Sequence, residues 1–101
     1  MAATFRLTLA QLNPVLGAID DNAAKAHAAW QAAKAAGADM VALPEMFLTG
    51  YQTQDLVMKP AFLRDVSAAL AALAARCADG PALGIGAPVA DAGGIYNAWH
   101  V

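Results

Sequence analysis

One glutamate at the end of an apolar run is the side chain with the clearest chemical use. Residues 40–43 form a continuous apolar run, and Pro44 and Glu45 follow it directly. Such a run predicts a strand covered on both faces in a parallel sheet, and open α/β sheets place their sites at the carboxyl ends of their strands. A carboxylate desolvated there would have a raised pKa, which suits a general base. Glu45 is therefore a candidate catalytic residue, and a solvated acid that merely follows a strand is the alternative.

Three more side chains have types that could take part in chemistry. Tyr51 ends the short segment that leaves Glu45, so it is a candidate substrate-binding residue, with simple packing as the alternative. Cys77 is the only cysteine, and its spacing places it on the apolar face of a helix, near the end where the helix dipole opposes thiolate formation. We therefore expect Cys77 to be a core residue. Lys59 is expected to solvate the loop before Pro60.

Metal and dinucleotide sites are not expected. His27 falls on a polar helix face and His100 lies near the chain end, and neither has a second ligand at metal spacing. The glycines at 84 and 86 lack the third glycine and the following helix of a dinucleotide fingerprint. No resident cofactor is therefore predicted for this chain.

Composition limits the kinds of partner that the chain is expected to bind. The 101 residues are 59% hydrophobic and 14% charged, against roughly 45–50% and about 25% in typical globular proteins. The surplus is mostly alanine, so we expect part of the apolar surface to meet further chain or another subunit. A net charge of −2 argues against nucleic acid, and no apolar run is long enough to cross a membrane. The N-terminus shows no export signal, so a cytoplasmic location is expected.

Hydrophobic periodicity predicts two strands joined by a helix in the first half of the chain. Residues 5–13 alternate imperfectly and predict a mostly buried strand. An alanine-rich helix ends near Ala36, with N-cap candidates at residues 20–22 and Gly37 as its left-handed C-terminal cap. The run over 40–43 then completes a βαβ unit.

The second half predicts one helix and two further strands. A long loop over residues 46–59 comes first, with a helical turn near 55–58. A helix then runs from Pro60 to about Asp79, and strands follow over 82–89 and 95–101. Pro88 is expected to end the first of these strands, and Gly84 and Gly86 predict the close approach of another backbone. A turn signal at residues 91–94 predicts a hairpin. The expected class is α/β with the order β-α-β-α-β-β.

The segment around Glu45 resembles a known catalytic motif. Pro44-Glu45 followed by Leu-Thr-Gly-Tyr at residues 48–51 is similar to the first motif of the nitrilase superfamily, whose enzymes cleave carbon–nitrogen bonds with a Glu-Lys-Cys triad. Residues 54–63 resemble a stretch of the glutamine-dependent NAD synthetases that other amidases usually lack. The opening strand and residues 96–98 also resemble that family, so the likeness covers almost the whole chain.

The resemblance implies a fold and a reaction. Residues 1–101 would be the N-terminal portion of a glutamine amidohydrolase domain, forming part of a four-layer αββα nitrilase-like sandwich. Glu45 would be the general base, while the lysine and the cysteine would follow later in a longer parent. That parent would hydrolyse glutamine and pass ammonia to a second domain, which uses ATP and magnesium to convert deamido-NAD to NAD. Family members commonly form homo-oligomers, and the 101-residue chain alone is expected to be inactive.

Two other readings share these residues. A different nitrilase-family amidase would keep Glu45 but lack the ATP-binding second domain. A non-catalytic interaction module of the same fold would lack the cysteine. Sequence downstream of Val101 would separate all three.

Overall fold

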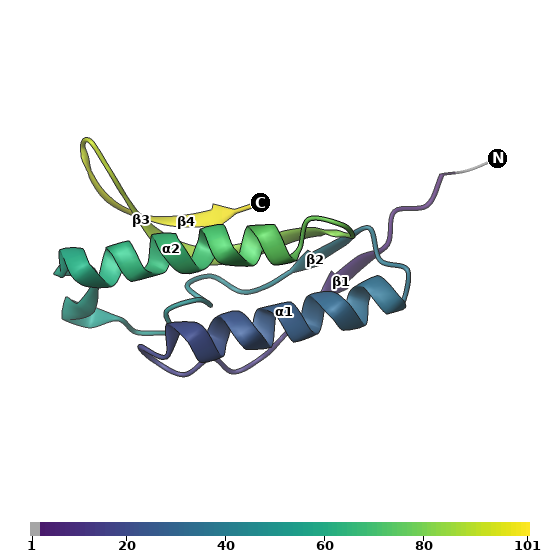
Figure 1. The fold of residues 1–101 in the computed structure, drawn as a ribbon, viewed down its shortest axis with the longest axis horizontal. Coiled ribbons are helices and arrows are strands. Elements are labelled where there is room, and N and C mark those ends of the chain that lie inside the picture. Colours follow the sequence, from purple (N-terminus) through teal and green to yellow (C-terminus); the bar gives the residue numbers. More distant parts are fainter. Residues whose placement is uncertain (1–2) are drawn as a thin grey trace.

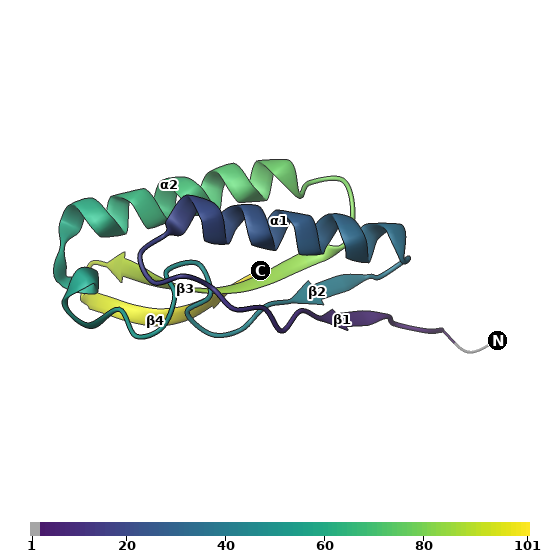
Figure 2. The same cartoon turned by 90° about the horizontal axis from the view of Figure 1, so that it is seen from below.

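The chain folds into a sheet with helices on one side only. A computed structural model describes residues 3–101 and shows two helices side by side over a four-stranded sheet (Figures 1 and 2). The elements in chain order are β1 (Leu7–Leu9), α1 (Ile19–Ala35), β2 (Met40–Ala42), the 3-10 helix η1 (Gln54–Met58), α2 (Pro60–Arg76), β3 (Ala82–Asp91) and β4 (Gly94–His100). The α/β class and the predicted order β-α-β-α-β-β are confirmed, as is the short helical turn in the long connection.

The sheet combines parallel crossovers with one hairpin. Its strand order is β1-β2-β3-β4, with β1, β2 and β3 parallel and β4 antiparallel to β3. The two helices make the parallel crossovers, as parallel pairs require. Asp91 pairs with Gly94 across the tight turn Ala92–Gly93, so the predicted hairpin is confirmed.

The core lies between the helices and the sheet. Val41 of β2 is buried beneath Trp30 of α1, and Ile85 of β3 belongs to the same cluster as Val66 and Leu73 of α2. In the sequence, apolar residues recur at helical spacing in each helix, and the buried helical residues belong to the two stripes so predicted: Ala23, Ala26, Trp30 and Ala33 in α1, and Leu63, Val66, Leu70, Leu73 and Cys77 in the α2 region. Helical spacing therefore identified the buried faces of both helices correctly.

The start of α1 differs from the prediction. Its N-cap is Ala18, and within residues 3–101 no side chain caps it. Asn22, expected as a cap candidate, is instead fully buried inside the first turns. Its amide nitrogen donates to the carbonyls of Val15 (2.8 Å) and Leu48 (3.0 Å), and its amide oxygen accepts from the Val15 N–H (2.8 Å). Asn22 therefore joins three segments, a role that local sequence cannot reveal.

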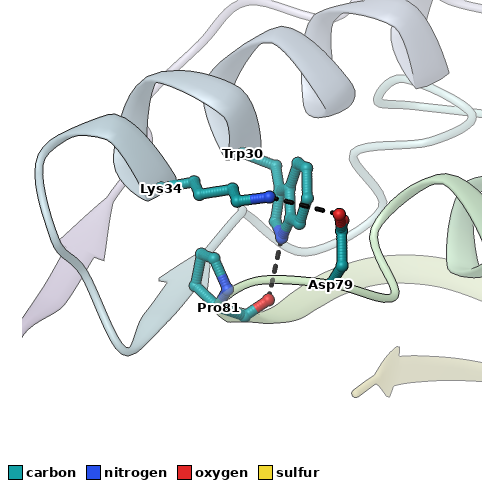
Figure 3. Close-up of polar contacts among 4 residues, drawn as sticks. All are labelled: Trp30, Lys34, Asp79 and Pro81. Carbon is teal, nitrogen blue, oxygen red and sulfur yellow. Dashed lines mark hydrogen bonds and ion pairs between the residues drawn. The ribbon is translucent and has the colours of Figure 1, made fainter.

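The C-terminal half of α1 is fastened to the connection between α2 and β3. The Trp30 indole N–H donates to the Pro81 carbonyl at 2.8 Å, and the Lys34 ammonium lies 3.3 Å from the Asp79 carboxylate (Figure 3). A Cβ at Gly80 would lie 2.6 Å from the Trp30 ring, so this glycine allows the loop to approach α1. Gly37 ends the helix region with φ of +80°, as predicted.

Two strand predictions were wrong. The first strand is short, and it is exposed rather than mostly buried, because β1 is an edge strand with helices over one face only. The third strand continues through Pro88 to Asp91. The N–H of Gly86 bonds the Pro44 carbonyl on the β2 side of β3. The nitrogen of Pro88 faces the same side two residues later, beyond the end of β2, so its missing N–H breaks no ladder bond.

The second face of the sheet is apolar and open. Thr8, Val41 and Leu83 are in register and point toward the helices, so their neighbours in each strand point away. Leu7 and Leu9 on that outer face are 50% and 68% exposed. Met40 and Ala42, on the outer face of β2, are only partly buried, so the expectation that β2 is covered on both faces is wrong for this chain, and helices cover one face alone (Figure 2).

Candidate active site

The backbone that carries Glu45 is bound along β3 after β2 has ended. The Leu43 N–H donates to the Gly84 carbonyl at 2.8 Å. Two further bonds follow, from the Gly86 N–H to the Pro44 carbonyl (3.2 Å) and from the Leu48 N–H to the Gly86 carbonyl (3.1 Å). The segment on both sides of Glu45 is thus anchored to one neighbouring strand.

Gly86 allows this segment to lie unusually close to β3. A Cβ at position 86 would be 2.6 Å from the Glu45 Cα and 2.3 Å from the Met46 nitrogen, which is closer than real Cβ contacts. The predicted close approach of another backbone is confirmed at Gly86. At Gly84 the prediction was wrong, because the space is taken by the Trp99 ring, with the nearest ring carbons 2.2 Å from a Cβ built there.

The residues after Glu45 form a packed plug. Phe47, Leu48 and Thr49 have no exposed surface, and Phe47 and Leu48 belong to the core beneath α2. Met46 has φ of +52°, and the Gly17 N–H donates to the Thr49 carbonyl at 2.8 Å. The loop is therefore a fixed part of the core, and it holds the backbone of Glu45 from the C-terminal side.

The Glu45 side chain itself is exposed. It lines a shallow hollow of about 280 Å³ together with Asn97, Ala98 and Trp99 of β4. The desolvation expected from sequence is therefore absent from this chain, because nothing covers the open face at this point within residues 3–101.

Tyr51 lies in a neighbouring hollow. This second hollow, of about 330 Å³, is lined by Met46, Tyr51, Gln52, Thr53 and Asn97. Asn97 lines both hollows, so the hollow of Glu45 and the hollow of Tyr51 share this residue. Tyr51 is 64% exposed and is available to a ligand.

The contribution of β4 to this site was not predicted from the sequence. Asn97 and Trp99 come more than fifty residues after Glu45, and they reach it only through the register of the β3–β4 hairpin. The Trp99 indole N–H donates to the Leu43 carbonyl at 2.9 Å, two residues before Glu45. The only sequence signal was the likeness of residues 96–98 to a family strand, which assigned none of them a role.

Cys77 and Lys59 lie where the sequence predicts. Cys77 is the C-cap of α2 and packs, partly buried, against both core clusters on the helix side. Burial raises the pKa of the Cys77 thiol; the neighbouring Arg76 guanidinium opposes this rise, and Asp79 adds to it. A raised pKa disfavours the thiolate needed for nucleophilic attack. Lys59 is the exposed N-cap residue of α2.

The histidines have structural contacts. The His27 ring stacks on Trp30 with 5.8 Å between ring centroids, and its Nδ1 lies 3.1 Å from the Arg76 guanidinium. The Nε2 of His100 lies 3.2 Å from the Ala87 carbonyl. Over residues 3–101, no group of three His, Cys, Asp or Glu side chains is placed to hold a metal ion. In the same part of the chain, neither helix has the length and apolar character of a membrane span.

The arrangement is that of one helix-and-sheet layer of a nitrilase-like fold, with a Pro-Glu pair at the exit of its second strand. Residues 6–100 match the Carbon-nitrogen hydrolase family, and the chain belongs to that family.

Comparison with individual proteins refines this assignment. The chain is 72% identical over 101 residues to a glutamine-dependent NAD(+) synthetase of Rhodobacter capsulatus, and it spans 18% of that protein's length. A crystal structure of a glutamine-dependent NAD(+) synthetase from Cytophaga hutchinsonii superposes with a TM-score of 0.88 at 28% identity, covering 96% of this chain and 17% of the other. An amidase from Nesterenkonia sp. shares the fold, with a TM-score of 0.69 at 23% identity over 83% of this chain and 32% of the amidase.

Proposed function

We propose that this chain is the N-terminal portion of the glutaminase domain of a glutamine-dependent NAD synthetase. The observation that carries the proposal is the 72% identity to the Rhodobacter capsulatus synthetase along all 101 residues. The backbone geometry around Glu45 supports it, because bonds to β3 and the buried plug fix the segment in which a catalytic glutamate would sit.

In this proposal Glu45 is the general base. It removes the proton from a cysteine thiol supplied by later sequence, and the thiolate attacks the carboxamide carbon of glutamine. A lysine, also from later sequence, stabilises the oxyanion of the tetrahedral intermediate. Glu45 gives the proton to the amide nitrogen as the intermediate collapses, so the C–N bond breaks and ammonia leaves. Water then hydrolyses the thioester to glutamate and restores the thiol. Tyr51 lines the pocket that holds the glutamine.

The remaining steps belong to a second domain of the parent protein. There the carboxylate of deamido-NAD would attack the α-phosphate of ATP, with magnesium present, to form an acyl-adenylate and release pyrophosphate. Ammonia then attacks the activated carboxylate, AMP leaves, and the carboxamide of NAD forms. We propose further that the parent is cytoplasmic and forms homo-oligomers, which would bury part of the alanine-rich surface.

The isolated chain is proposed to be inactive. Glu45 is solvated in an open hollow, and the only thiol is that of Cys77, which packs on the helix side of the sheet. Completion of the domain would cover the apolar outer face and remove water from around Glu45.

A graft tests the proposal. This chain replaces the matching residues of the Rhodobacter capsulatus synthetase, and NAD formation is measured with glutamine or with free ammonia as the nitrogen source. Because free ammonia bypasses glutamine hydrolysis, it reports on the second domain alone. We expect Glu45→Gln to lower glutamine-dependent synthesis by about 10²–10⁴-fold and to leave ammonia-dependent synthesis unchanged. Full glutamine-dependent activity in Glu45→Gln would overturn the assignment of Glu45.

A further inference from the structure

We propose that Trp99 is a positioning residue that fixes the backbone carrying Glu45. The inference rests on the proposed function, because it assigns Trp99 a part in the reaction that Glu45 would perform. Trp99 acts through the β2 exit and need not touch the substrate.

The first observation is a hydrogen bond at the point where β2 ends. The Trp99 indole N–H donates to the Leu43 carbonyl at 2.9 Å, while the Leu43 N–H bonds the Gly84 carbonyl at 2.8 Å. Leu43 is thus held from β3 by its own N–H and from β4 by its carbonyl. Because Pro44 follows directly and has a fixed φ, holding Leu43 also limits the direction of the chain at Glu45.

The second observation is the pair of glycines beneath the site. Gly84 and Gly86 point to the same side of β3, since they are two residues apart in a strand. The first admits the Trp99 ring, and the second admits the backbone of Glu45 and Met46. The ring and the Glu45 backbone therefore lie next to each other on β3, and both need the absence of a side chain.

The third observation is where the rest of the ring lies. Trp99 is 47% exposed and lines the same hollow as Glu45, whereas Trp30, the other tryptophan, is 3% exposed and packs in the core. Each indole donates to a backbone carbonyl, that of Leu43 or that of Pro81. The two tryptophans thus make the same type of bond, one beside the candidate base and one on the opposite side of the sheet.

This pair provides a matched test in the graft described above. Trp99→Phe and Trp30→Phe each remove one indole donor and keep an aromatic ring. We expect Trp99→Phe to lower the glutamine-dependent kcat about tenfold, because small displacements of a reacting group reduce rate strongly, with the KM for glutamine changed less than about twofold. Trp30→Phe should leave that kcat unchanged but lower the Tm more than Trp99→Phe does, since Trp30 is the more buried.

A second variant breaks the hydrogen bond between Trp99 and Leu43 without removing the indole. Gly84→Ala places a methyl group where the Trp99 ring lies, so the ring must leave the Leu43 carbonyl. It should also lower the glutamine-dependent kcat while ammonia-dependent synthesis stays at the wild-type rate. Gly84→Ala carries the test if Trp99→Phe lowers the Tm below the assay temperature.

The outcomes separate the two proposals. Equal glutamine-dependent kcat values in Trp99→Phe, Trp30→Phe and the unmodified graft would overturn the positioning role, while an inactive Glu45→Gln would leave the proposed function intact. Parallel losses of kcat and ammonia-dependent synthesis in Trp99→Phe would also overturn it, because they indicate general damage. Full activity in Glu45→Gln would overturn the proposed function and the positioning role together.

Discussion

The two faces of the sheet differ in how complete they are. On the helix side, Val41 and Ile85 are buried under α1 and α2, and the indole of Trp30 is bonded to the Pro81 carbonyl. On the outer side, Leu7 and Leu9 stand exposed, and the hollow beside Glu45 is open. The chain therefore completes one interface of its sheet and presents the candidate base on the other.

This difference distinguishes the positioning of Glu45, which the chain provides, from its desolvation, which the chain does not provide. The direction of the backbone at Glu45 is set within the chain by β3, by the buried plug and by Trp99. The dry surroundings of a catalytic carboxylate are not provided by residues 3–101. Under the proposed function, residues 3–101 position Glu45, and its desolvation would come from residues outside that range.

The largest effect on stability is expected at Gly86, where the backbone that carries Glu45 packs against β3. Gly86→Ala would force a methyl group against the backbone of Glu45 and Met46, neither of which can rotate away. We expect the free energy of unfolding of the isolated chain to fall by about 3 kcal/mol, measured by urea denaturation. Gly93→Ala is the control, because a Cβ at Gly93 would lie 3.2 Å from the Tyr96 hydroxyl, which is the far end of a side chain rather than backbone. Equal effects of the two substitutions would contradict the close packing at Gly86.

The second-largest effect is a difference in stability between substitutions on the two faces of the sheet. Val41→Ala removes buried methyl groups and should lower the free energy of unfolding of the isolated chain by about 2 kcal/mol. Leu9→Ala removes more atoms from the open face, yet it should change the same quantity by no more than about 0.5 kcal/mol. In the graft, the Leu9→Ala cost should rise well above that value if a second layer covers this face. A cost for Leu9→Ala that is already large in the isolated chain would contradict the open face described here.

The smallest effect is a pH dependence on the helix side. Burial raises the pKa of the Cys77 thiol above its ordinary value of 9.0, so the folded state holds this proton to higher pH than the unfolded state does. The contribution of Cys77 to the free energy of unfolding is therefore complete below that pH and declines as the pH rises above it. We expect Cys77→Ala to remove this part of the decline in stability with pH. It is measured as the difference between two urea-denaturation series over pH, one on the unmodified chain and one on Cys77→Ala. Identical pH profiles would place Cys77 in a more solvated position.

The sequence predicted most of the fold, and the reasons for the exceptions are physical. Helical spacing found the buried faces of α1 and α2, and turn residues found the hairpin. The exposure of β1 could not be predicted, because it depends on whether a second layer covers the sheet. Asn22 and Pro88 were misassigned because their roles depend on Leu48 and on the end of β2, both distant in sequence.

The candidate site was predicted only in part for the same reason. Glu45 follows directly from the strand-Pro-Glu pattern, and Tyr51 lies on the loop that leaves it. Asn97 and Trp99 complete the hollow through strand register, and a single sequence gives no signal for that. The preference of Gly84 for a ring and of Gly86 for a backbone was equally invisible, since both read simply as glycine in a strand.

The most direct test of the central claim follows the amide nitrogen of glutamine. The graft carrying this chain is supplied with glutamine labelled with ¹⁵N at the side-chain amide, together with ATP and deamido-NAD, and the NAD formed is analysed by mass spectrometry. Our account predicts NAD with ¹⁵N in its carboxamide, and loss of that label in Glu45→Gln while free ammonia still supports synthesis. A graft that makes NAD from free ammonia but never from glutamine would contradict the claim that this chain completes a glutaminase.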